Sequence, residues 1–268
     1  MKQTVDNCRI DPLRLSSLLG PAADRFTVEA LPECISTSTL LLERARHGAP
    51  SGSLLVADRQ SGGRGRRGRS WLSTADDSLT FSLLWGFTGD FARLTGLSLA
   101  VGLAVARALE NCGVPRVGLK WPNDIQLDGG KLGGILIDLE SGREGMLAVI
   151  GIGLNLRLPP AGDEEFLQRP AALAQVMACP PDRHQLLAQL LIDLAAVLDR
   201  FCDGGFAVLR GEWQARHVWQ DRQVRLLDGE RVDRQGTCLG ADSDGALLLQ
   251  TEVGVERCFS GDVSLRVA

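Results

Sequence analysis

A short segment rich in arginine and glycine is the part of the chain best suited to chemistry on an anion. It reads Gly63-Arg64-Gly65-Arg66-Arg67-Gly68-Arg69-Ser70-Trp71. Glycine lets backbone N–H groups approach a ligand closely, and arginine binds phosphate or carboxylate through two parallel hydrogen bonds. The segment therefore predicts an anion-binding loop in which Trp71 can stack on a base. A flexible basic surface loop or an RNA-binding tract has the same composition, and the pattern is not that of a Walker A loop.

Two of the three lysines of the chain lie in short motifs, whereas the other 26 basic residues are arginines. In Lys120-Trp121-Pro122-Asn123-Asp124, a lysine and an aspartate bracket a rigid proline turn at a strand end. This aspartate can hold Mg²⁺ or orient an amine, and the lysine can reach a phosphate. In Lys131-Leu132-Gly133-Gly134-Ile135-Leu136, two glycines beside the lysine leave room for a ligand. Taken singly, an ordinary turn with a surface ion pair explains the first of these motifs equally well, and a hairpin turn at Asp128-Gly129-Gly130 explains the second better.

A fourth motif, Gly151-Ile152-Gly153-Leu154-Asn155, lacks the third glycine and the following helix of a dinucleotide-binding fingerprint. A Rossmann nucleotide site is therefore not expected.

The elements that must position these motifs are short strands and amphipathic helices. Apolar spacing and capping residues predict helices at Leu13–Leu19, from Ser36–Thr39 to about His47, and at Leu97–Asn111, His184–Phe201 and Phe206–Trp219. Short apolar runs predict strands at Ser53–Asp58, Ser78–Trp85, Val117–Trp121, Ile125–Leu127, Ile135–Glu140 and Leu147–Gly151. The close spacing of these strands favours hairpins over long βαβ crossovers.

The pattern changes at Asp221, after which turns separate five short strands. These lie at Val224–Leu227, Gly236–Ala241, Ala246–Gln250, Val255–Phe259 and Val263–Val267, and they predict a small β-barrel. We therefore expect an N-terminal extension (1–25), a main domain (26–220) and a C-terminal domain (221–268).

Composition excludes several classes of protein. The 268 residues are 44% hydrophobic and 23% charged, which is typical of a globular protein, and the net charge of −4 argues against a general nucleic-acid binder. The longest apolar run, Leu97–Ala106, is too short to span a bilayer, and no secretory signal is visible. Seven scattered cysteines and three histidines do not form a zinc motif. We expect a cytoplasmic protein with free thiols and no membrane partner.

Taken together, the order and spacing of the four motifs resemble the catalytic module of biotin–protein ligases, from about Phe26 to the end of the chain. The resemblance implies an α+β fold, with a mixed-sheet catalytic domain related to class II aminoacyl-tRNA synthetases followed by an SH3-like β-barrel. It also implies an ATP-dependent ligase that uses Mg²⁺. Such an enzyme activates biotin to biotinyl-5′-AMP and transfers it to a lysine of a biotin carboxyl carrier protein, as in acetyl-CoA carboxylase.

The resemblance also implies roles for individual residues. The implied biotin contacts are Ser36, Thr37, Ser38, Gln60, Gly63, Arg64, Gly65, Arg66, Lys131, Gly134 and Gly151. The implied nucleotide contacts are Arg66, Arg69, Trp71, Asn123, Lys131 and Asn155. Catalysis is expected from Arg64, Arg66, Lys120, Asp124 and Lys131, with Asp124 also holding Mg²⁺ and drawing a proton from the acceptor amine. Ser38 stands where the family usually has asparagine.

Three other functions compete with this interpretation: a lipoate–protein ligase, a non-catalytic biotin sensor and an RNA-binding module. The complete set of motifs favours biotin over lipoate. Only 35 residues precede Ser36, which leaves no room for a winged helix, so DNA binding is not expected. The basic cluster is confined to one loop of an acidic chain, which disfavours RNA. Homodimerisation is compatible with the resemblance.

Overall fold

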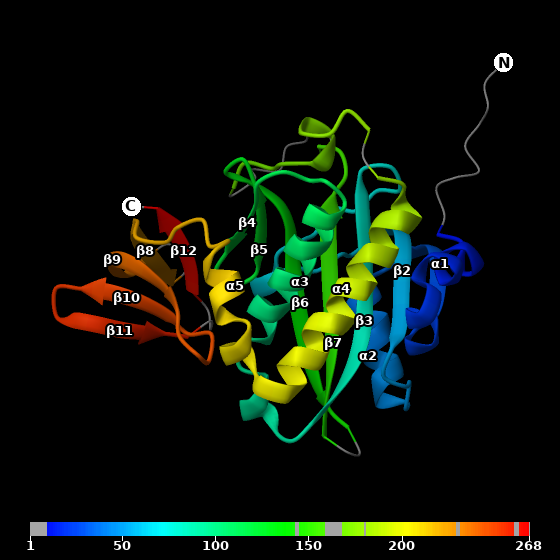
Figure 1. The fold of residues 1–268 in the computed structure, drawn as a ribbon, viewed down its shortest axis with the longest axis horizontal. Helices are drawn as coiled ribbons and strands as arrows, with labels where there is room; N and C mark the ends of the chain where they lie inside the picture. The colour runs from blue at the N-terminus through cyan, green and yellow to red at the C-terminus, as the bar shows by residue number, and fades with distance from the viewer. Residues whose placement is uncertain are drawn as a thin grey trace.

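A computed structural model describes residues 10–142, 145–158, 168–179, 181–228, 231–259 and 263–267. Its larger part is built on a seven-stranded sheet in the order β1-β2-β3-β7-β6-β5-β4 (Figure 1). The strands are β1 (Thr27–Cys34), β2 (Ser53–Gln60), β3 (Ser78–Thr88), β4 (Val117–Lys120), β5 (Asp124–Leu127), β6 (Gly130–Ser141) and β7 (Gly145–Asn155). Only β1 and β2 pair in parallel, so the sheet is mixed. The run from β4 to β7 is antiparallel, as its short spacing predicts.

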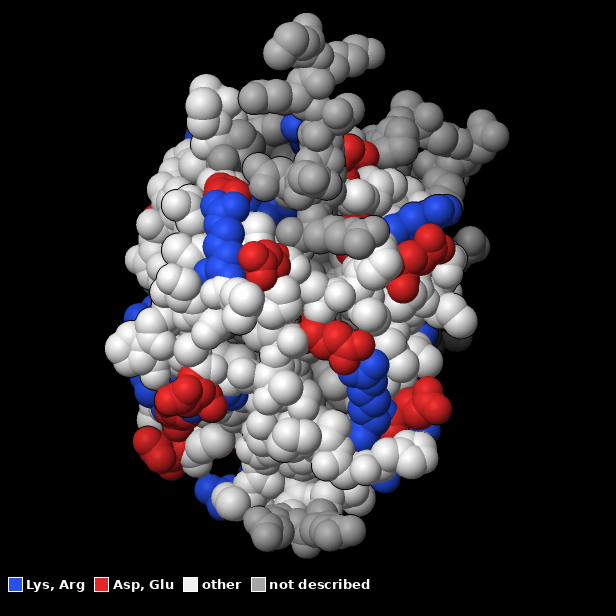
Figure 2. Space-filling model, turned by 90° about the vertical axis from the view of Figure 1, so that its right-hand side faces the viewer, with Lys and Arg blue, Asp and Glu red and all other residues white. Residues whose placement is uncertain are grey.

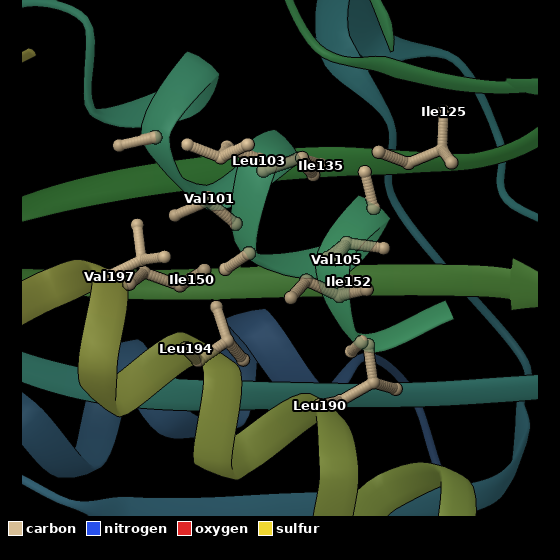
Figure 3. Packing of buried hydrophobic residues seen from close by; sticks show 14 of the residues in the cluster. Val101, Leu103, Val105, Ile125, Ile135, Ile150, Ile152, Leu190, Leu194 and Val197 are labelled. Atoms are coloured by element: carbon tan, nitrogen blue, oxygen red, sulfur yellow. The ribbon is translucent and has the colours of Figure 1, made fainter. Parts of the chain in front are cut away.

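Helices cover both faces of this sheet. On one face lie α3 (Leu97–Asn111) and α4 (Arg183–Gly204), which pack against each other and carry most of the core. Figure 3 shows α3 valines and leucines facing isoleucines of β6 and β7, with α4 leucines beside them. On the other face, α2 (Thr37–Arg46) buries Leu41 and Ala45 against a separate small cluster. The predicted helices in these three regions are confirmed, as is α1 (Pro12–Leu19), which packs on α4.

The segment Phe91–Asn111 is long and apolar enough, by length and composition alone, to cross a membrane. Within the fold, 67% of its most apolar window is buried, because α3 lies between the sheet and α4. Such burial is typical of the core helix of a globular domain.

Two sequence expectations need correction. The helix predicted over Phe206–Trp219 is broken into a 3₁₀ turn, Phe206–Val208, and a short α5, Arg210–Gln214. The chain then leaves helical geometry because its backbone pairs with β4, where Leu119 N donates to Arg216 O at 2.8 Å and Val218 N donates to Leu119 O at 3.0 Å. Strand β1 was not predicted, since its mixed polar and apolar residues, including Pro32, suit only the edge of a sheet.

The smaller C-terminal part is an antiparallel sheet in the order β11-β10-β9-β8-β12. Its strands are β8 (Gln223–Asp228), β9 (Arg231–Ala241), β10 (Leu247–Thr251), β11 (Gly254–Cys258) and β12 (Val263–Val267), and all five predicted strands are confirmed. Two side chains outside this sheet bind its backbone: Trp121, which follows β4, donates from Nε1 to Gly245 O at 3.1 Å, and Gln214 of α5 donates from Nε2 to Leu239 O at 3.0 Å.

Charges on the face around α1, α2 and β1 form neighbouring pairs. Figure 2 shows basic and acidic side chains next to one another on this face, without a broad basic area. Among the pairs of this region are Arg25 with Asp199 and Arg44 with Glu29. Such interspersed charges are typical of a solvated surface.

Candidate active site

All four sequence motifs contribute to one cavity at the ends of the central strands. It is lined by the start of α2, the end of β2, the β4–β5 turn and parts of β6 and β7. The segment Gly63–Trp71, here called the arginine–glycine loop, also contributes to the lining. The lining includes every predicted site residue except Gly63 and Asn155. The fold therefore brings together side chains that are more than one hundred residues apart in the sequence.

One end of the cavity is lined by buried hydroxyl and amide groups. Ser36 caps α2, with its hydroxyl accepting from Thr39 N at 3.4 Å, and this places the next two residues at the cavity wall. Thr37 donates to Gln60 Oε1 from both its backbone N, at 2.7 Å, and its hydroxyl, at 3.1 Å. Ser38 Oγ lies 3.0 Å from Ser82 Oγ. These groups offer donors and acceptors without a net charge, which suits a neutral polar ring.

Glycine at position 151 is required for this arrangement. A Cβ atom there would lie 2.4 Å from Ser38 Oγ and 3.5 Å from Ser82 Oγ. Any larger residue would therefore fill the polar end of the cavity or displace the Ser38 hydroxyl.

The arginine–glycine loop is a small hairpin that forms one wall. Gly65 N donates to Arg69 O at 2.7 Å and Trp71 N donates to Gly63 O at 2.8 Å, while Arg66–Gly68 form a 3₁₀ turn. A Cβ at Gly63 would lie 2.4 Å from Trp71 O, so this glycine closes the hairpin instead of lining the cavity. These backbone hydrogen bonds give the loop a defined conformation, in contrast to the flexible surface loop that its composition also allows.

Two side-chain contacts join the arginine–glycine loop to the sheet, one an ion pair and the other a hydrogen bond to an amide oxygen. Arg64 Nη2 lies 2.5 Å from Asp138 Oδ2 on β6, and Arg66 Nη1 donates to Asn123 Oδ1 at 3.3 Å. Asn123 is held in turn because its Nδ2 donates to Ile135 O at 2.7 Å. Arg64 and Arg66 are therefore directed toward β6 and the β4–β5 turn, respectively.

Trp71 lies flat against β7 because residue 153 is glycine. A Cβ at Gly153 would come within 2.4–2.6 Å of the indole ring. The buried Nε1 of Trp71 has no hydrogen-bond partner among the described residues. An indole ring at the cavity wall suits a planar ring such as a purine base.

The charged end of the cavity is centred on Asp124. Its Oδ1 lies 2.6 Å from Lys131 Nζ, and its Oδ2 lies 3.3 Å from Lys120 Nζ. Burial alone would raise the pKa of the Asp124 carboxyl, but the charges of Lys131 and Lys120 outweigh burial and lower its pKa to about 2. Burial lowers the pKa of the Lys120 ammonium to about 8, despite the charge of Asp124.

The geometry at Asp124 does not suit a resident metal ion. Both carboxylate oxygens already face ammonium groups, and Oδ2 also accepts from Gln168 Nε2 at 2.8 Å. In the part of the chain that the structure describes, no group of three or more His, Cys, Asp or Glu side chains is placed to bind a metal. The expected direct bond from Asp124 to Mg²⁺ does not fit these residues.

Among the residues of the site that sequence reasoning missed are Ser82, Gln168 and Arg266. Ser82 lies inside an ordinary apolar strand, and Gln168 lies in a segment without a motif. Arg266 enters the cavity from β12 of the C-terminal sheet. The pKa of the Arg266 guanidinium is lowered by burial and by the charge of the neighbouring Arg69, and the charge of Asp124 offsets only part of this shift. No local sequence signal distinguishes any of the three.

Asn155 supports the site from outside. Its Nδ2 donates to Ala171 O at 3.0 Å and to Lys131 O at 3.4 Å. The side chain therefore fixes the backbone that carries Lys131, and it does not line the cavity.

Comparison with known proteins gives matches over both parts of the chain. Residues 31–155 match the biotin/lipoate A/B protein ligase family, and residues 221–266 match the biotin protein ligase C terminal domain. Over 261 residues the chain is 34% identical to the bifunctional ligase/repressor BirA of Escherichia coli, covering 97% of this chain and 80% of that protein. Over 260 residues it is 31% identical to the biotin–[acetyl-CoA-carboxylase] ligase of Mycobacterium tuberculosis, covering 92% and 91%.

The fold is also that of a solved relative. The biotin protein ligase from Aquifex aeolicus in complex with biotin and ATP aligns with a TM-score of 0.74 and 31% identity, covering 91% of this chain and 99% of that chain. The predicted α+β architecture, a mixed-sheet domain followed by a small β domain, is confirmed. With its four motifs around one cavity, and with relatives similar along most of its length, this chain belongs to the biotin protein ligase family.

Proposed function

We propose that this protein is a biotin–protein ligase that works in two steps. In the first step, the carboxylate of biotin attacks the α-phosphorus of ATP, which gives biotinyl-5′-AMP and releases pyrophosphate. In the second step, a lysine amine of a biotin carboxyl carrier domain attacks the acyl carbon, which forms an amide and releases AMP. The observation that carries the proposal is the polarity of the cavity, with neutral hydroxyls at one end and cations at the other.

This polarity matches the first reaction because both reactants are anions. The neutral end, built by Thr37, Ser38 and Gln60, suits the uncharged ureido ring of biotin. The carboxylate then points toward Lys131 at the other end. Lysine and arginine side chains there reduce the repulsion between carboxylate and phosphate, and they stabilise the charge that develops in the transition state.

Arginines from two parts of the chain would hold the nucleotide. Arg66 and Arg69 come from the loop, and Arg266 comes from the C-terminal sheet. Trp71 offers the face for the base. We propose that Arg266 gives the C-terminal domain a direct part in binding the triphosphate.

The second step needs an amine that is not protonated, and a free lysine has a pKa of about 10.4. Asp124, with a pKa of about 2, is too weak a base to remove that proton. We propose instead that Asp124 attracts and orients the acceptor lysine, and that the small fraction of this amine that is already unprotonated in solution is the form that attacks the acyl carbon. This revises the expectation that Asp124 draws off the proton itself.

Magnesium is proposed as part of the MgATP substrate, because Mg²⁺ is commonly held by phosphate oxygens and water. We assign no protein ligand to it. We propose further that the protein works in the cytoplasm, where ATP and carrier domains meet, and that its catalytic domain spans residues 26–220 and its C-terminal domain residues 221–268.

The test is to incubate the pure protein with biotin, MgATP and a biotin carboxyl carrier domain and to measure the mass of the carrier. We expect the mass to increase by one biotinyl group, and biotin-dependent exchange between ATP and pyrophosphate to occur without the carrier. Lipoate offered in place of biotin should compete poorly. If lipoate were transferred and biotin were not, the alternative ligase would be the correct function.

A further inference from the structure

Gln168 forms a bridge inside the charged end of the cavity. Its Nε2 donates to Asp124 Oδ2 at 2.8 Å, and its Oε1 accepts from Lys120 Nζ at 2.9 Å. A carboxamide can donate to a carboxylate and accept from an ammonium at the same time, which neither a carboxylate nor an ammonium can do. Lys120, Gln168 and Asp124 therefore form a closed triangle of hydrogen bonds, since Lys120 also reaches Asp124 Oδ2 at 3.3 Å.

Lys131 stands outside this triangle on the other oxygen of Asp124. Its Nζ lies 2.6 Å from Oδ1, and 28% of its side chain is exposed, against 2% for Lys120. The buried Lys120 is fixed further because its Nζ lies 4.7 Å from the centre of the Trp219 ring. Of the two lysines, only Lys131 has room to turn toward the cavity.

This arrangement resolves a conflict within the proposed function. Adenylation requires the Lys131 ammonium near the substrate anions, yet in the structure it is paired with Asp124. If Lys131 left a carboxylate with no other partner, the cost would be high, because an uncompensated buried charge is strongly unfavourable. Lys120 and Gln168 remain on Oδ2 and keep that carboxylate compensated.

We propose that Gln168 is a positioning residue that holds Asp124 against Lys120 and thereby releases Lys131 to the substrate anions. The inference rests on the proposed function. Without the amide, Asp124 loses a donor and Lys120 loses an acceptor, so Asp124 holds Lys131 more strongly. Replacement of Gln168 is therefore expected to slow the adenylation step and to leave the binding of biotin unchanged.

Kinetics of adenylate formation test the inference with Gln168→Leu and Gln168→Glu. The leucine variant removes both hydrogen bonds. The glutamate variant keeps the acceptor for Lys120 but loses the donor to Asp124. The matched control is Gln175→Leu, the same change in the 3₁₀ turn that follows, where the side chain only accepts from Ala172 N at 3.0 Å.

We expect each Gln168 variant to lower kcat for ATP–pyrophosphate exchange about 10- to 100-fold, the range for a hydrogen bond to a charged group. KM for biotin should stay within about twofold of the wild-type value, and the control should keep the wild-type kcat. An unchanged kcat in both Gln168 variants overturns the inference while the exchange activity of the wild type still supports the proposed function. A loss of biotin affinity equal to the loss of kcat also overturns it.

A spectroscopic measurement reads the contact directly, because the chain has only three lysines. Lysine labelled with ¹³C at Cε gives three signals, which Lys2→Arg and Lys131→Arg assign. In the wild type, biotin with MgATP should move the Lys131 signal and leave the Lys120 signal in place. In Gln168→Leu without substrates, the Lys120 signal should be displaced. If the Lys120 signal has the same position in Gln168→Leu as in the wild type, the hydrogen-bonded bridge through Gln168 is refuted, whether or not the protein is a biotin ligase.

Discussion

Replacement of His217 by phenylalanine is expected to remove an acid-dependent loss of stability where the two sheets meet. The His217 side chain is buried, and its ring stacks on Trp213 with centroids 4.7 Å apart and planes at 23°. Neither ring nitrogen has a hydrogen-bond partner among the described residues. Its neighbours in sequence, Arg216 and Val218, pair with Leu119, the residue before Lys120. This packing therefore supports the strand that carries a lysine of the site.

The magnitude follows from the pKa of His217, which burial lowers from 6.5 to about 4. Because the folded-state pKa lies below the unfolded value, the unfolded chain binds more protons between pH 6.5 and 4. The stability of the wild type is thus complete above pH 6.5 and is lost as the pH falls toward 4. At pH 5 the loss from this one group is about 2 kcal/mol, and below pH 4 it approaches about 3 kcal/mol.

Phenylalanine fills the same stacked position and cannot be protonated. Urea unfolding followed by circular dichroism at pH 7.5, 6.0 and 5.0 should show a stability gain for His217→Phe that grows by about 2 kcal/mol between the highest and the lowest pH. At pH 7.5 a gain of roughly 1 kcal/mol is expected from removing two unpaired ring nitrogens. The exposed His47, changed to glutamine, controls for the removal of one histidine. A gain for His217→Phe that is the same at all three pH values would refute the reasoning.

Other substitutions test the site itself. Lys131→Arg should slow adenylation about 100-fold, because a broad guanidinium replaces a compact ammonium, whereas Lys2→Arg should leave ATP–pyrophosphate exchange unchanged; equal effects would contradict this. Gly151→Ala should raise the Kd for biotin roughly tenfold or more, since its Cβ would lie 2.4 Å from Ser38 Oγ, and adding Ser38→Ala should restore part of the affinity in calorimetry. If the double variant recovered no affinity for biotin, the contact with Ser38 Oγ would not be the cause of the weaker binding. Arg266→Ala should raise KM for ATP roughly tenfold and leave biotin binding without nucleotide unaltered; a defect in biotin binding alone would argue against a nucleotide role.

Much of the site could be predicted from the sequence because it is built from local motifs. A hydroxyl before an apolar run predicts the cap of α2, and the structure has Ser36 in that position. Alternating glycines predict a loop that can approach a ligand, and the proline in the Lys120–Asp124 motif predicts a tight turn. In each case the decisive interactions lie within a few residues, so the spacing of residue types reports them directly.

The sequence by itself determined the family, the motifs and most of the helices and strands of this protein. Only the tertiary structure decided that Asp124 is shared by two lysines, that Gln168 bridges Lys120 and Asp124, and that Arg266 reaches the cavity from the C-terminal sheet. The physical reason is separation along the chain. Gln168 lies 44 residues from Asp124, and hydrogen bonds over such distances leave no periodic or composition signal. Burial would raise the pKa of Asp124, and the lysine charges that outweigh burial and lower it come close only once the strands have assembled.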